Sequence, residues 1–60
     1  MNDLFNNELS TGDTVAFNAP MSKGLTTGVI TNIKPEKVHI EYGSTLVALY
    51  GFETVKEIKL

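Results

Sequence analysis

The chain has 60 residues, no cysteine, and seven acidic residues against five lysines, which gives a net charge of −2. Disulfides and thiolate metal sites are therefore excluded, and His39, the single histidine, cannot form a zinc site without help. Arginine, the commonest reader of guanine edges, is absent. Its absence and the acidic balance disfavour direct binding to nucleic acid.

The length predicts one small domain. A chain of this size buries only about 60% of the surface that it exposes when unfolded, so it is near the lower limit for folding alone. No apolar run is long enough to cross a membrane. The start of the chain, MNDLFNNEL, lacks the basic residues and apolar core of a signal peptide. We therefore expect a cytoplasmic location, with residues 1–11 as an extension of a domain that spans residues 12–60.

The extension contains Leu4, Phe5 and Leu9 at a spacing that predicts a short helical turn, with Asn2 or Asp3 as its cap. Such a turn could cover an apolar face of the domain. A second interpretation rests on a resemblance. Asp3-Leu4-Phe5 is similar to the Q-x-[S/D]-L-F peptides by which bacterial proteins dock onto the DNA sliding clamp, although the glutamine does not match.

Turn residues at short intervals, between runs rich in valine, isoleucine, threonine and aromatics, predict an all-β meander. The first strand is expected over residues 14–18, with Val15 and Phe17 on its buried face. A long loop follows over residues 19–27.

The second strand is expected over residues 27–33. Ile30 and Ile33 are three residues apart, so strict alternation cannot place both on one face. This spacing predicts a β-bulge or a sharp bend in the strand. A turn over residues 34–37 follows, with Pro35 at its second position.

Two further strands, residues 37–42 and 45–50, are expected to form a hairpin around Gly43-Ser44, because glycine at the first turn position permits the geometry that hairpins prefer. This turn fixes which residues face each other. The inner pairs are Tyr42 with Thr45, Ile40 with Val47 and Val38 with Leu49, and the outer pairs are Glu41 with Leu46, His39 with Ala48 and Lys37 with Tyr50.

The C-terminal stretch ETVKEIKL has the spacing of a capping box, with Thr54 followed three residues later by Glu57. A helical turn there would lead into a last short strand over residues 58–60. The alternative is one continuous strand over residues 54–60.

Five short strands, a bent second strand and a helical turn before the last describe an SH3-like barrel. The stretches GDTVAF and GVITNIKPEKVHI resemble the KOW/Tudor-type SH3-like barrels, and the similarity covers residues 12–42. The matching positions are Gly12-Asp13, Val15, Phe17, Gly28, Ile30, Ile33, Val38 and Ile40. The resemblance implies a binding module for RNA, ribosomal or transcription components, or peptides. It also implies a contact at the loop beside the bent strand, here Met21, Lys23 and Leu25.

No catalytic, cofactor or metal-binding constellation is evident in the sequence. His39 lies between Lys37 and Glu41 on an outer strand face, where a solvated histidine is the simplest interpretation. The carboxylates are scattered, and no pair has the apolar surroundings that would raise a pKa. We expect a protein that is not an enzyme.

The strand over residues 45–50 is apolar on both faces, so Leu46 and Tyr50 are expected to form an exposed apolar strip. Three explanations remain open: the extension covers the strip, a second copy of the chain does, or a foreign protein does. The lysines are expected to serve solubility or to form a weak phosphate-contacting edge, with Tyr42 or Tyr50 stacking on bases. The expected partner-binding residues are Lys34, Lys37, His39, Leu46 and Tyr50.

The sequence thus predicts a non-enzymatic interaction module whose partner is a protein or ribonucleoprotein of the transcription or translation machinery. As a small, acidic, single-domain chain, it resembles accessory proteins of phages or mobile elements. The alternatives are a domain that binds RNA or DNA directly and a structural homodimer.

Overall fold

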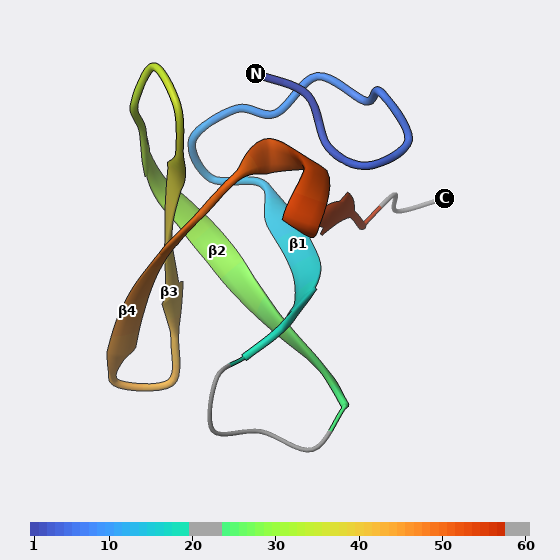
Figure 1. Ribbon diagram of the computed structural model, residues 1–60. Coiled ribbons are helices and arrows are strands. Elements are labelled where there is room, and N and C mark those ends of the chain that lie inside the picture. The colour runs from blue at the N-terminus through green and yellow to red at the C-terminus, as the bar shows by residue number, and fades with distance from the viewer. Residues whose placement is uncertain (20–23, 58–60) are drawn as a thin grey trace.

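The computed structural model describes residues 1–19 and 24–57 and contains one antiparallel sheet of five strands (Figure 1). The strands are β1 (Thr14–Asn18), β2 (Leu25–Ile33), β3 (Val38–Tyr42), β4 (Thr45–Leu49) and β5 (Val55–Lys56), and a 3-10 helix, η1 (Gly51–Glu53), joins β4 to β5. Their order across the sheet is β4-β3-β2-β1-β5. The predicted all-β class is confirmed. The sheet is not closed, because β4 and β5 stand at its two ends.

The bend in the second strand is confirmed. The pairing of β2 with β3 shifts register between Ile30 and Asn32, as a β-bulge requires. Ile30 is fully buried, and Ile33, on the other side of the bulge, still packs against the core. Gly28 makes the close approach of β2 to β3 possible, since a Cβ at this position would lie 2.6 Å from a methyl carbon of Ile40.

The hairpin of β3 and β4 has the predicted turn. Gly43 has a φ of 59°, while Ser44 is not among the described residues with positive φ. These signs fit a type II′ turn, which matches the twist of the flanking strands. All the pairs predicted between residues 38–42 and 45–49 are observed. The hairpin therefore sorts its side chains into inner and outer faces as expected.

The core lies on the inner face of the sheet. Its buried apolar members are Leu9, Val15, Phe17, Ala19, Ile30, Val38 and Ile40. The ring of Tyr42 packs edge-on against Phe17, with 5.2 Å between ring centroids. Val47 and Leu49 of β4 are half-buried at the margin of this core.

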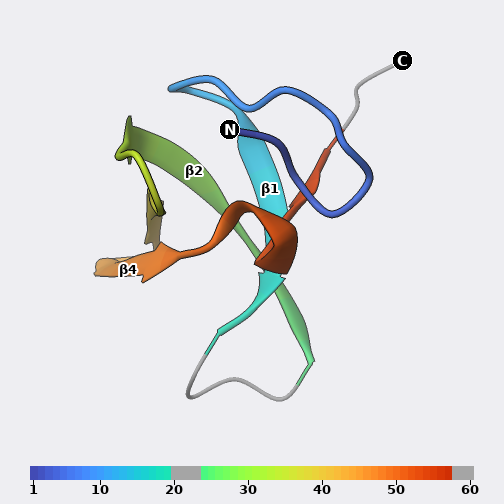
Figure 2. The ribbon, with the colours of Figure 1, turned by 45° about the horizontal axis from the view of Figure 1, so that its top comes forward.

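The predicted N-terminal helical turn is wrong. Residues 1–11, here called the N-terminal segment, form a loop that is closed by a bridge between Asn2 and Glu8. Asp3 organises this loop, because its carboxylate accepts hydrogen bonds from the amides of Phe5 and Asn7. Leu9 enters the core instead of covering the outer face. Figures 1 and 2 both place the segment beside η1 and β5, at the end of the sheet opposite β4.

The helical turn before the last strand exists, but its N-cap is Tyr50, four residues earlier than the capping box predicts. Thr54 ends η1 instead of starting a helix, since its amide and its hydroxyl both donate to the carbonyl of Gly51. The residues that follow pair with β1, and the amide of Glu57 donates to the carbonyl of Thr14. A helix starting at Thr54 would lose those bonds. The strand predicted over residues 58–60 lies outside the described residues.

Candidate interaction surface

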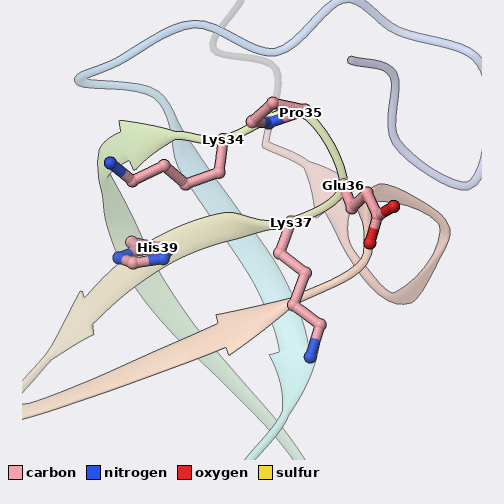
Figure 3. Close-up of a pocket in the computed structure, with 5 residues that line it drawn as sticks. All are labelled: Lys34, Pro35, Glu36, Lys37 and His39. Carbon is pink, nitrogen blue, oxygen red and sulfur yellow. The ribbon is translucent and has the colours of Figure 1, made fainter.

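The turn between β2 and β3 carries a cluster of basic side chains. Lys34, Pro35, Glu36, Lys37 and His39 line an open hollow of about 430 Å³. Figure 3 shows that Lys34 and His39 point to the same side, whereas Lys37 points away from them toward β4. Glu36 adds a negative charge to the same rim. The hollow therefore brings together three of the predicted contact residues without concentrating their charge.

Lys37 connects this hollow to a pair of stacked aromatic rings. Its Nζ lies 4.9 Å from the ring centroid of Tyr50, which is within the range of a cation–π contact. The ring of Tyr50 in turn stacks on that of Phe52, with 5.4 Å between centroids and 5° between planes. Sequence reasoning missed Phe52. The signal that could have found it is the spacing of two aromatics around Gly51, since the tight turn of η1 brings their rings together.

Phe52 also belongs to an apolar groove at the β5 end of the sheet. Three exposed side chains from separate segments meet there: Leu4 of the N-terminal segment, Leu25 at the start of β2 and Phe52 of η1, with 58%, 74% and 64% of their surfaces exposed. The groove encloses about 320 Å³, and its lining is completed by Ala16, Phe17, Asn18, Glu53 and Val55. The structure thus joins two residues predicted for unrelated reasons, Leu4 and Leu25, to one that was not predicted.

Leu46 is not part of this groove. It is 67% exposed and lies near the hairpin turn, opposite Glu41. Four residues along an extended strand separate it from Tyr50 by about 13 Å. The predicted strip is therefore present on the outer face, but its two large side chains do not contact each other within one chain.

Asp3 is part of the fold. Only 5% of its surface is exposed. Its carboxylate accepts bonds from the amides of Phe5 and Asn7, from the side chain of Asn7 and, at 2.6 Å, from the amide of Lys56. Burial alone raises the pKa of Asp3, but these hydrogen bonds favour the charged form and hold the pKa below its ordinary value of 3.8.

The predicted docking peptide, Asp3-Leu4-Phe5, is therefore partly buried and partly exposed. Asp3 is buried, whereas the side chains of Leu4 and Phe5 are exposed. The amide of Leu4 is held by the carbonyl of Thr54 at 2.9 Å. Docking of this peptide on a clamp stays a prediction, and it would have to proceed with Asp3 bound inside the fold or after its release.

Two other predicted contact residues, Met21 and Lys23, lie outside the described residues. Within residues 1–19 and 24–57, no group of three or more histidine or acidic side chains could hold a metal ion. No helix in the described part of the chain is long and apolar enough to cross a membrane.

The model of one protein family, described as a domain of unknown function (DUF7205), matches residues 1–58. The chain therefore belongs to the DUF7205 family. No curated protein and no solved structure matches it.

Proposed function

We propose that this member of the DUF7205 family is an SH3-like barrel of the KOW/Tudor type that acts as a non-enzymatic interaction module and binds a protein. The architecture is supported by three observed features. The last strand pairs with the first, the second strand is bulged, and a 3-10 turn precedes the last strand.

The observation that carries the proposed activity is the apolar groove. Leu4, Leu25 and Phe52 each leave more than half of their surface in water, although they come from three segments that are distant in the sequence. Large apolar side chains gathered around one hollow usually mark a contact surface. A groove of this kind fits an apolar side chain of a protein, with the rings of Tyr50 and Phe52 as its border.

The class of partner follows from the resemblance stated above. KOW/Tudor-type barrels favour a protein or ribonucleoprotein component of the transcription or translation machinery. The size and composition of the chain are similar to those of accessory proteins of phages or mobile elements.

Direct binding to nucleic acid is the second candidate function. It is favoured by two observations: Lys34 and His39 point to the same side of the hollow (Figure 3), and Lys37 lies over the ring of Tyr50, which stacks on that of Phe52. Stacking rings beside cations suit single-stranded nucleic acid. Glu36 on the same rim and the net charge of −2 weigh against it. Binding of this kind would weaken steeply as salt is raised.

The two candidates are separated by affinity capture from a lysate of the organism that carries the gene, with and without nuclease. We expect a protein that is captured in both conditions and is lost with Leu25→Asp. The matched control is Leu46→Asp, because Leu46 has a similar exposure but lies outside the groove. Capture that nuclease abolishes would overturn the proposal in favour of nucleic acid. Capture that both variants retain equally would also overturn it.

A further inference from the structure

The free edge of β4 has a backbone pattern suited to pairing with another strand. The residues that flank a two-residue turn form a hydrogen-bonded pair, and the pattern then alternates along an antiparallel hairpin. Starting from the pair Tyr42 and Thr45, the backbone groups of Val47 and Leu49 face β3. Those of Leu46 and Ala48 consequently face away from the sheet.

No element of the described chain covers this edge. The backbone hydrogen bonds outside the strands include none to Leu46 or Ala48, and β4 has one neighbouring strand. Figures 1 and 2 show β4 at the border of the molecule, with no described segment beyond it. Natural edge strands are usually protected by charged residues, proline or bulges. Residues 45–50, TLVALY, contain no charge and no proline, and the hairpin pairing has no register shift.

We propose that two copies of this chain pair antiparallel along β4, with the two-fold axis at Ala48. The amide and carbonyl of Ala48 in each copy then bond to those of Ala48 in the other, and the amide of Tyr50 donates to the carbonyl of Leu46 of the second copy. The two sheets become one continuous sheet. This inference rests on the strand pairing and is independent of the proposed groove partner.

The side chains select this register. A two-fold axis at Ala48 places Leu46 opposite Tyr50 of the second copy, so each of two exposed apolar side chains covers the other. On the inner face, Val47 lies opposite Leu49 of the second copy, which extends the margin of each core across the junction. Pairing centred on Val47 would instead place Leu46 opposite Ala48 and Tyr50 opposite Ser44 of the hairpin turn, so the two large apolar side chains would not cover each other.

The charges beside the strand do not oppose a second copy. Glu41 pairs with Leu46, and Lys37 lies over the ring of Tyr50. A row across the junction runs from Glu41 through Leu46 to Tyr50 and Lys37 of the second copy, so it has an acid at one end and a lysine at the other. The two-fold axis generates a second row of the same kind, which runs in the opposite direction. No two like charges face each other in this register.

Cysteine cross-linking tests the register, because the chain contains no cysteine of its own. Facing residues of a hydrogen-bonded antiparallel pair have Cα atoms about 5.5 Å apart, which a disulfide can span. We expect Ala48→Cys to form a covalent dimer under mild oxidation. Leu46→Cys alone should form little, but it should cross-link when mixed with Tyr50→Cys. Ser44→Cys, exposed in the hairpin turn, is the control and should remain monomeric.

Cross-linking of Ala48→Cys with Leu46→Cys, in place of the self-reaction of Ala48→Cys, would overturn the proposed register. Equal cross-linking of Ser44→Cys and Ala48→Cys would show random collision and would overturn the dimer.

Sedimentation of the unmodified chain over a range of concentrations gives a second test. We expect a monomer–dimer equilibrium that Ala48→Pro abolishes, because proline removes the outward amide. The amide that Ala48→Pro deletes is not used by β3, so the circular dichroism of the monomer should be retained. A monomer at all concentrations up to the millimolar range would contradict the proposal, as would an equilibrium that Ala48→Pro leaves unchanged while the fold is retained.

Discussion

The two edge strands of the sheet, β5 and β4, differ in whether their outward backbone groups are hydrogen-bonded within the chain. At the β5 end, the N-terminal segment lies along the outer edge: the amide of Leu4 donates to the carbonyl of Thr54, and the carboxylate of Asp3 accepts from the amide of Lys56. At the β4 end, the outward backbone groups of Leu46 and Ala48 have no partner in the described chain. The N-terminal segment therefore covers the β5 edge, and no described segment covers the β4 edge.

The lengths of the two strands explain part of this difference. β5 has two residues and pairs with β1 at two positions, so its position depends on the bonds that the N-terminal segment adds. β4 has five residues and pairs with β3 along its whole length through a tight turn. A hairpin of that kind holds its strand without cover. The β5 end is thus stabilised within the chain, while the β4 end is left available for contacts with another molecule.

The largest expected effect is at Asp3. Asp3→Ala would leave the amides of Lys56, Phe5 and Asn7 without their acceptor. Because hydrogen bonds to charged groups are strong and buried unpaired donors are costly, we expect a loss of about 2–3 kcal/mol in the free energy of unfolding, measured by urea denaturation. Asp13→Ala is the matched control. Asp13 is a more exposed acid that pairs with Lys56 at 3.4 Å and accepts from the amide of Ser10 at the surface, and its loss should cost about 1 kcal/mol. An equal cost for the two variants would contradict the role given to Asp3.

A smaller effect is expected at Gly51, where the N-terminal segment crosses η1. A Cβ at this position would overlap the carbonyl oxygen of Asn2 and come within 2.8 Å of the side chain of Met1. Gly51→Ala should therefore push the segment away and cost about 1–2 kcal/mol. Thermal unfolding measures the cost, and faster exchange of the Leu4 amide would locate it. Unchanged stability together with unchanged exchange would show that the segment does not depend on this contact.

Acid should weaken the β5 end through Asp3. The pKa of Asp3 is lowered in the folded chain, so its contribution to stability is complete above the ordinary value of 3.8 and is lost as the pH falls through the lower folded-state pKa. We expect the free energy of unfolding to fall as the pH drops below about 4. Asp3→Asn, which cannot titrate, should show a shallower fall over the same range. Parallel curves for the two proteins would assign the acid sensitivity to other groups.

The smallest effect on folding is expected on the outer face of β4. Leu46 is exposed, so Leu46→Lys should change the free energy of unfolding of the monomer by no more than about 0.5 kcal/mol. The same change should remove self-association, because a lysine on an edge strand opposes pairing with another chain. Urea denaturation at low concentration and sedimentation at high concentration measure the two effects. Self-association that survives Leu46→Lys would move the contact away from this edge.

The sequence predicted the parts of the fold that depend on local chemistry. The glycine-led turn at Gly43 determined the register of the hairpin, and the spacing of Ile30 and Ile33 indicated the bulge, because both signals act within a few residues. The N-terminal segment and η1 could not be predicted in the same way. Asp3 looked like a helix cap, but its strongest partner is Lys56, 53 residues away. Local spacing carries no information about such a bond.

The same limit applies to the candidate surface. Lys34, Lys37 and His39 lie close in sequence and line one hollow. The groove of Leu4, Leu25 and Phe52 joins three distant segments, and Leu4 is held there by the bonds of the N-terminal segment to Thr54 and Lys56. The sequence shows that each of these side chains is apolar, but only the long-range pairing shows that they share one groove.

Amide hydrogen exchange, followed by NMR residue by residue at low protein concentration, tests the contrast between the two edges most directly. We expect slow exchange at Leu4 and Lys56, whose amides are bonded across the β5 edge, and fast exchange at Leu46 and Ala48, in alternation with protected amides at Val47 and Leu49. Raising the concentration should slow exchange at Ala48 and Tyr50. Protection of Leu46 and Ala48 at high dilution, or exchange at Lys56 as fast as theirs, would contradict the account.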